Sequence, residues 1–209
     1  DAATNSPIAV LDAAELTLVR TAAVSMLAVS HLVPAAAPRV VVVGSGPQTV
    51  AHASAAVAVL GASRVQAVVR GAASAERLRA AAYAVGTGIE PVDASGSGEA
   101  AATALREADV IVCATSSAVP VLDDVDVREG AVVVAIGAHE PTARELPTAL
   151  VGRAFVVVES SAVARTEAGD VVIAESELGR AVIGADLAAL VRGEVAVPTD
   201  RPRVFKSVG

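Results

Sequence analysis

The stretch VVVVGSGPQT, Val40–Thr49, joins four β-branched residues to two glycines that are one residue apart. A continuous β-branched run is typical of a strand buried on both faces of a parallel sheet. After such a strand, Gly44 would permit a tight turn, and Gly46 would let the backbone approach a pyrophosphate at the start of a helix. Thr49 stands where a third glycine is usual, so a simple strand-to-helix turn remains the alternative to dinucleotide binding.

Strand and helix patterns alternate along the rest of the chain. Apolar residues at helical spacing predict helices over 14–32 and 47–60, and Ser74 is a candidate N-cap for a helix over 75–83. The alternation predicts an α/β fold of the Rossmann type, a doubly wound and mainly parallel sheet with helices on both faces. The expected strands cover 39–43, 64–69, 89–92, 109–115, 131–137 and 155–159, and further helices are expected to end near Glu107 and to break near Pro147.

The composition argues against several classes of protein. The 209 residues carry a net charge of −7 without a basic patch, which argues against nucleic acid as a partner. Cys113 is the single cysteine, so we expect no internal disulfide, no metal site and a reducing cytoplasm. Charged residues, glycine or proline interrupt each apolar run, so we expect no membrane partner. The chain begins without methionine and ends just after an apolar–basic stretch, so we expect a piece of a longer protein.

The end of the second expected strand bears on the choice of cofactor. An NAD site usually places a carboxylate there for the ribose 2′-hydroxyl, whereas an NADP site favours an arginine for the 2′-phosphate. The strand ends in Val69-Arg70-Gly71, with no carboxylate. Arg70 therefore favours NADP(H), with NAD(H) still possible, and an ordinary solvated arginine is the alternative.

Small residues follow the fourth and fifth expected strands at the same carboxyl edge, where ligands of open α/β sheets bind. Thr115, Ser116 and Ser117 could bond a ribose, although a plain turn rich in hydroxyl residues explains them equally well. Gly137 and Ala138 would leave room for a flat ring.

His139 follows that glycine–alanine pair, and it is the only one of three histidines expected on the ligand edge. An imidazole there could give or take a proton near neutral pH. The alternative is a residue that only shapes the loop. His31, near a helix end, and His52, inside a helix, are expected to be structural or surface residues.

Five segments occur in one order and cover nearly the whole chain: LTLVRTAA (16–23), VVVVGSGPQ (40–48), ADVIVCATSSAVPVL (108–122), GAHEPTAREL (137–146) and FKSVG (205–209). Together they resemble the ornithine cyclodeaminase/mu-crystallin family. The resemblance implies a Rossmann domain inserted between two parts of a substrate-binding and dimerising domain, and hence a homodimer. It divides the chain into the end of the substrate region (1–33), the Rossmann domain (34–185) and a return segment toward the substrate domain (186–209).

The resemblance also implies roles for single residues. Arg20 would hold the substrate carboxylate, and with His139 it makes up the expected catalytic pair. Thr21 would contact a cofactor phosphate, and Lys206 and Ser207 would lie near the nicotinamide. The full set of expected cofactor contacts is Thr21, Gly44, Ser45, Gly46, Pro47, Gln48, Arg70, Thr115, Ser116, Ser117, Gly137, Ala138, Lys206 and Ser207.

His139 stands where cyclodeaminases of the family have an aspartate that handles the substrate amine. The form Gly-Ala-His-Glu-Pro is more similar to relatives that reduce cyclic imino acids. The resemblance therefore implies an NAD(P)H-dependent reductase of small cyclic imino acids, of the Δ1-pyrroline-2-carboxylate or ketimine reductase type. The alternatives are an ornithine cyclodeaminase or alanine-dehydrogenase-like enzyme, and a non-catalytic NADP-binding protein like the crystallin branch.

Overall fold

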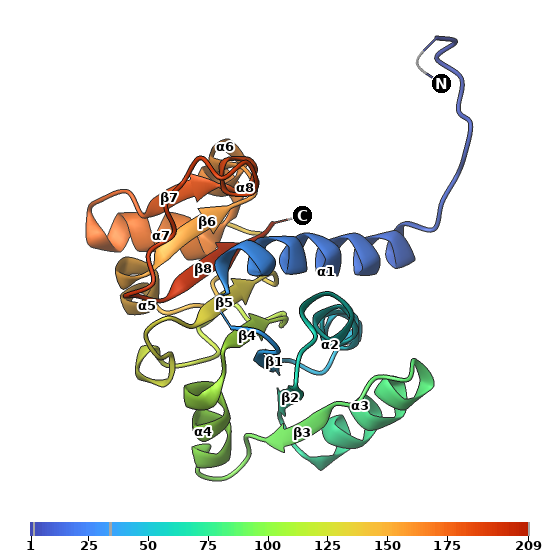
Figure 1. Cartoon of the computed structure of the whole chain (residues 1–209), viewed down its shortest axis with the longest axis vertical. Coiled ribbons are helices and arrows are strands. Elements are labelled where there is room, and N and C mark those ends of the chain that lie inside the picture. The colour runs from blue at the N-terminus through green and yellow to red at the C-terminus, as the bar shows by residue number, and fades with distance from the viewer. Residues whose placement is uncertain (2, 34, 209) are drawn as a thin grey trace.

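The computed structural model describes residues 1, 3–33 and 35–208, and within them one parallel sheet of eight strands forms the centre (Figure 1). The strand order is β3-β2-β1-β4-β5-β8-β6-β7. This confirms the predicted Rossmann-type parallel sheet. The strands are β1 (Arg39–Val43), β2 (Arg64–Val69), β3 (Glu90–Asp93), β4 (Val110–Cys113), β5 (Val132–Ala135), β6 (Phe155–Val158), β7 (Ile183–Asp186) and β8 (Arg203–Lys206).

The valine run forms a central strand because both of its faces are covered. β1 pairs in parallel with β2 on one side and β4 on the other. Val40 and Val42 point into the apolar cluster of one face, and Val41 and Val43 point into the cluster of the opposite face. Successive side chains of a strand alternate between faces, so a strand buried on both sides needs an unbroken apolar sequence.

Helices cover both faces of the sheet, as Figure 1 shows. The apolar clusters place α1, α2, α3 and α8 on one face and α4, α5, α6 and α7 on the other. Their bounds are α1 (Ala13–Leu32), α2 (Pro47–Leu60), α3 (Ala72–Ala84), α4 (Glu99–Glu107), α5 (Thr148–Arg153), α6 (Ser161–Glu167), α7 (Gly169–Leu178) and α8 (Leu187–Val191), with a 3₁₀ turn η1 (Asp124–Asp126).

Two strands, one helix and one cap differ from the sequence prediction. The helix expected to break near Pro147 instead begins after it, at Thr148. The expected strands stop at residue 159, whereas the structure adds β7 and inserts β8 between β5 and β6. Residues 203–206 of the expected return segment therefore belong to the sheet, while the division into domains remains a prediction. Ser74 is not the N-cap of α3, because the helix begins at Ala72 and Gly71 caps it with a φ of 87°. Such a positive φ favours glycine.

Helix α1 is the longest helix among the described residues, with 20 residues, and the Asp12 carboxylate caps it by accepting the Ala14 N–H at 2.8 Å. By length and composition alone it could cross a membrane, with a mean hydropathy of 1.3 over its best window. A third of that window is buried (33%) and packs on α2 and the sheet. One such helix is weak support for a span, because core helices pass the same test.

Candidate functional site

A cleft of about 1240 Å³ opens along the carboxyl ends of β2, β1, β4 and β5. It is larger than the roughly 300–1,000 Å³ usual for a drug-sized ligand. Chain order reverses between β1 and β4, and ligands of open α/β sheets bind at such a reversal. The walls are the turn after β1, the end of β2, the loops after β4 and β5, and the side of α1.

The two glycines of the turn after β1 have different surroundings. Gly44 has a φ of 141°, and a Cβ there would lie 2.5 Å from the Ala114 carbonyl oxygen of the neighbouring strand end. Gly46 has an ordinary φ of −88°, and a Cβ there would meet nothing within 4 Å. The chain itself therefore requires Gly44, whereas the space beside Gly46 is open for a ligand at the start of α2.

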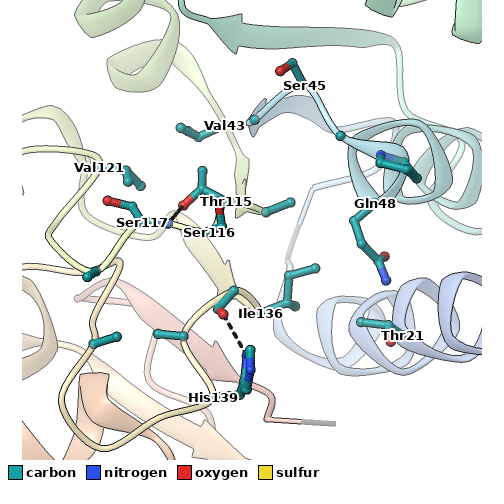
Figure 2. Close-up of a pocket in the computed structure, with 18 of the residues that line it drawn as sticks. Thr21, Val43, Ser45, Gln48, Thr115, Ser116, Ser117, Val121, Ile136 and His139 are labelled. Carbon is teal, nitrogen blue, oxygen red and sulfur yellow. Dashed lines mark hydrogen bonds between the residues drawn. The ribbon is translucent and has the colours of Figure 1, made fainter.

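The start of α2 and the facing side of α1 offer unused polar groups. Among the described residues no side chain caps α2; Pro47 has no N–H and the Thr49 N–H donates to the Gly46 carbonyl at 3.0 Å, which leaves the Gln48 N–H for an anion at the helix start. The Thr21 Oγ1 and the Gln48 Oε1 are buried without a hydrogen-bond partner in the described residues. Figure 2 shows Gln48 extending from α2 toward Thr21 on α1. The Thr21 hydroxyl and the open space at Gly46 fit the phosphates of a dinucleotide, and the Gln48 side chain can donate to a phosphate through its NH₂ group.

His52 joins α1 to α2 behind this wall. Its Nδ1 lies 2.9 Å from the Gln48 carbonyl oxygen, and its Nε2 lies 3.0 Å from the Ser25 hydroxyl. A carbonyl only accepts, which assigns the ring proton to Nδ1 and makes Nε2 the acceptor. Burial lowers the pKa of His52, so the ring is neutral. His52 is therefore a structural residue, in agreement with the sequence interpretation.

The end of β2 carries Arg70 on the rim of the cleft, with Ser74 beside it in the lining. Arg70 is exposed. A carboxylate does stand nearby, but on β3: Asp93 accepts the N–H groups of Gly71 at 3.0 Å and Ser95 at 2.9 Å. These backbone donors, Ser95 first, lower the pKa of Asp93. Asp93 thus fixes the turn that carries Arg70.

The loop after β4 presents Ser116 to the cleft more freely than its neighbours. The Thr115 hydroxyl donates to the Glu145 carboxylate at 2.7 Å, and the Ser117 hydroxyl donates to the Val119 carbonyl at 2.7 Å. Within the described part of the chain, the Ser116 hydroxyl has no such partner, and Figure 2 shows it with Thr115 and Ser117 at the cleft. The hydroxyls of Thr115 and Ser117 shape the loop, which leaves Ser116 as the free hydroxyl.

Glu145 is a residue of the site that sequence reasoning missed. Its side chain is fully buried behind the loops after β4 and β5. It accepts the Thr115 N–H at 2.8 Å and the Gly137 N–H at 2.6 Å, besides the Thr115 hydroxyl. Burial is the main cause that raises its pKa, and these hydrogen bonds oppose the rise. A single glutamate among polar loop residues carries no sequence signal of this role.

Gly137 is a glycine for a reason other than the expected one. A Cβ there would lie 1.9 Å from the Thr115 carbonyl oxygen and 2.7 Å from the Glu145 carboxyl group. Close packing between the two loops therefore excludes any side chain at Gly137, whether or not a flat ring lies beside it. Ala138 is buried in the same loop and also lines the cleft.

Arg20 and His139 reach the same cleft from different elements. Arg20 lies on α1 and is half-buried, and His139 is exposed on the loop after β5. The His139 Nδ1 lies 3.1 Å from the Gly137 carbonyl oxygen, the contact drawn in Figure 2. That carbonyl assigns a proton to Nδ1 and leaves Nε2 as the ring nitrogen available to a ligand.

Lys206 is the expected site residue that the structure does not bring to the cleft. Its ammonium group pairs with the Asp170 carboxylate at 3.1 Å, and both side chains are 1% exposed. Ser207, the next residue, does line the cleft, and its hydroxyl donates to Glu159. The other expected contacts, Ser45 and Pro47 included, all lie in the lining.

Comparison with known proteins agrees with this geometry. The sequence profile of the ornithine cyclodeaminase/mu-crystallin family matches residues 1–209. The chain belongs to the ornithine cyclodeaminase/mu-crystallin family. Relatives in the family include a Δ1-pyrroline-2-carboxylate reductase of Burkholderia ambifaria, which is 36% identical over 211 residues that cover 100% of this chain. An NAD(P)H-dependent anabolic L-arginine dehydrogenase of Pseudomonas aeruginosa is also 36% identical, over 99% of this chain and 64% of its own length.

A solved structure of the family has the same fold. Thermococcus litoralis Δ1-pyrroline-2-carboxylate reductase in complex with NADH and L-proline aligns with a TM-score of 0.88 at 25% identity, over 100% of this chain and 64% of that one. The chain spans 63% of the length of the Burkholderia relative. The sheet and cleft described above are thus part of what a whole protein of this family contains.

Proposed function

We propose that the protein containing this chain reduces small cyclic imino acids of the Δ1-pyrroline-2-carboxylate type with NADPH. The observation that carries the proposal is a single cleft that combines a dinucleotide turn, a half-buried arginine and a histidine. The similarity to Δ1-pyrroline-2-carboxylate reductases supports the same reaction.

The cofactor, when bound, supplies a hydride to the carbon of the C=N bond. The Arg20 guanidinium pairs with the substrate carboxylate, because its planar fork matches the two oxygens, and this orients the imine carbon. The imine nitrogen must gain one proton for the product amine. His139 would supply that proton from Nε2 in its doubly protonated, imidazolium form, or pass it on from a water, while its Nδ1–H donates to the Gly137 carbonyl.

Arg70 supports NADPH over NADH. It is exposed at the rim of the cleft at the end of β2, where the nearby Asp93 carboxylate of β3 is occupied by backbone donors. A guanidinium there fits a 2′-phosphate better than a 2′-hydroxyl.

The assembly we propose is a homodimer in the cytoplasm. Large apolar side chains stand exposed before and along the first half of α1, with Val10 96%, Leu11 70% and Val19 66% exposed. Such a patch is typical of a surface that another chain covers. The single cysteine, Cys113, is buried, and a reducing compartment suits a free thiol.

The decisive experiment assays the whole protein with NADPH against pyrroline and piperideine carboxylates, ornithine, alanine and the 2-oxo acid of arginine with ammonia. We expect oxidation of NADPH with the cyclic imines. The arginine dehydrogenase relative makes the linear 2-imino acid the second candidate. NADPH binding without turnover of any compound would overturn the proposal in favour of a binding protein, and release of ammonia from ornithine would favour a cyclodeaminase.

Two variants separate substrate binding from chemistry. Arg20→Ala should raise KM by roughly tenfold to a hundredfold and leave the NADPH Kd unchanged, because a charge-assisted contact is worth about 1.5–3 kcal/mol. His139→Ala should lower kcat by roughly tenfold to a thousandfold, the scale of general acid–base catalysis. His31→Ala and Arg79→Ala, both exposed and outside the cleft lining, are the matched controls.

A further inference from the structure

Glu145 ties together the two loops that flank the substrate end of the cleft. Its Oε1 accepts from the Thr115 N–H and hydroxyl, and its Oε2 accepts from the Gly137 N–H. Thr115 follows β4 and Gly137 follows β5, so one carboxylate spans the ends of two adjacent strands.

An ionised carboxylate suits this set of contacts, because its two oxygens only accept. Each oxygen meets one backbone N–H group, from Thr115 and from Gly137, and the Thr115 hydroxyl adds a third donor. Glu145 is fully buried, and charge-assisted hydrogen bonds of this kind offset the free-energy cost of removing its charge from water. The Glu145 carboxylate therefore joins the two loops through charge-assisted hydrogen bonds, and Glu145 itself is not one of the residues that line the cleft.

The buried ion pair between Asp170 and Lys206 holds the backbone of Glu145 in place. The Asp170 Oδ1 accepts the backbone N–H groups of Glu145 and Leu146, each at 2.8 Å. The other Asp170 oxygen pairs with the Lys206 ammonium at 3.1 Å, in the strand next to β5. Glu145 thus has its backbone anchored on α7 and its side chain anchored on two loops.

The packing leaves the His139 loop little freedom. A Cβ at Gly137 would lie 1.9 Å from the Thr115 carbonyl oxygen. A Cβ at Gly169, at the start of α7, would lie 1.9 Å from the Ala143 carbonyl oxygen. The loop between β5 and α5 is pressed against its neighbours on both sides, so a change at Glu145 would be transmitted to His139.

We propose that Glu145 is a positioning residue, which sets the distance between the Thr115–Ser117 loop and the Gly137–His139 loop for hydride and proton transfer. This inference rests on the proposed function. The proposed phosphate-binding groups lie on α1, at the start of α2 and at the end of β2, and thus on elements other than the two loops that Glu145 joins. Displacement of the loops should therefore impair the chemical step much more than it weakens cofactor binding, since a shift of about 1 Å can cost roughly a hundredfold in rate.

Glu145→Gln tests the inference with almost no change of volume. The glutamine oxygen can accept from one loop, but its NH₂ group would face a donor of the other loop. In the native chain the Thr115 and Gly137 amides should exchange hydrogen slowly, and in the variant at least one should exchange tenfold or more faster. The Ala114 amide, which donates to Val43 at 2.9 Å, is the internal control and should not change.

Activity of the whole protein gives the second readout. We expect Glu145→Gln to lower kcat roughly tenfold to a hundredfold, with the NADPH Kd within a factor of about three and a larger isotope effect from 4-deuterated NADPH. Glu167→Gln, an exposed glutamate of α6, is the matched control and should leave kcat unchanged. If Glu145→Gln does not fold, Thr115→Val removes the hydroxyl that donates to Glu145 and accepts the Ser117 N–H, leaves the backbone contacts of Glu145 in place, and should still lower kcat severalfold.

The outcomes are distinguishable. Unchanged exchange at Thr115 and Gly137, or equal losses of kcat and NADPH affinity, would overturn the positioning role. A native protein that binds NADPH and reduces no imino acid would overturn the proposed function and the catalytic half of this inference, while the exchange result still decides whether Glu145 joins the loops.

Discussion

Gly44 and Gly46 are two residues apart, yet they are glycines for different physical reasons. Gly44 has a left-handed backbone and lies against the Ala114 carbonyl of the next strand end, so the fold needs it. Gly46 has an ordinary backbone and open space around it among the described residues, so the fold does not require a glycine there. The sequence pattern Gly-Ser-Gly shows both glycines but does not reveal this difference.

This contrast predicts opposite effects for two substitutions. Gly46→Val should leave the thermal unfolding temperature within a few degrees of native and abolish NADPH binding, because the side chain fills the space where a pyrophosphate would lie. Gly44→Ala should destabilise the fold by about 1–3 kcal/mol or more through strain and a 2.5 Å clash. Calorimetry and fluorescence titration measure both. Normal NADPH binding by Gly46→Val would show that the turn is only structural.

Arg70 gives the second prediction at this scale. In Arg70→Ala the affinity for NADPH should fall roughly tenfold to a hundredfold, since a charge-assisted hydrogen bond is worth about 1.5–3 kcal/mol. The affinity for NADH should stay the same, because it lacks the 2′-phosphate. Arg79→Ala, on an exposed position of α3, is the control. Equal affinities of the native protein for NADPH and NADH would contradict the proposed preference.

At the scale of elements, the wall of the cleft depends on how α1 packs on α2. Thr21 on α1 and Gln48 on α2 each present to it a polar side-chain atom that has no hydrogen-bond partner in the part of the chain that the structure describes. His52, buried on α2, holds the two helices together, because its ring bonds both to the Gln48 carbonyl and to the Ser25 hydroxyl of α1. The helix that carries Arg20 is therefore held to α2, the helix that follows Gly46.

The buried ring predicts a pH dependence of stability. Burial lowers the pKa of His52 below its ordinary value of 6.5, so the unfolded chain binds the proton more readily. Above pH 6.5 the neutral ring makes its full contribution to the free energy of unfolding. That contribution falls as the pH drops toward the folded pKa of His52, by at most about 1.4 kcal/mol per pH unit.

Urea unfolding at about pH 7.5 and about pH 5.5 measures this dependence. His52→Gln should lose less stability between the two conditions than the native chain. The exposed His31 provides the control through His31→Gln. An equal loss in the native chain and in His52→Gln would contradict the assignment.

At the scale of the whole molecule, β8 joins the two halves of the sheet. It pairs with β5 on one side and β6 on the other, although it comes last in the chain. Phe205 in its middle is fully buried and packs in the cluster that includes α1 and α2. Arg203 donates to the Leu32 carbonyl at 2.7 Å, which ties the strand to the end of α1.

Phe205→Ala should therefore cost about 3–5 kcal/mol of unfolding free energy, because a large side chain leaves a cavity at the centre of the sheet. Tyr83→Ala is the matched control, since Tyr83 is 88% exposed and its loss should change stability by less than about 0.5 kcal/mol. Chemical denaturation of both variants measures the difference. Similar values for the two would show that β8 adds little to the core.

The sequence by itself determined the Rossmann-type sheet, the glycine turn and most of the cleft residues. These follow from local patterns: valine runs mark doubly buried strands, and residues at the ends of parallel strands meet at one edge. Only the tertiary structure decided the place of β8 and the roles of Glu145 and Lys206. Arg203 and Lys206 bound a strand of four residues, so its pattern is not apolar, and its neighbours lie far away in the chain. A buried charge is stable only with partners, and those partners come from separate elements that the sequence does not show to be adjacent.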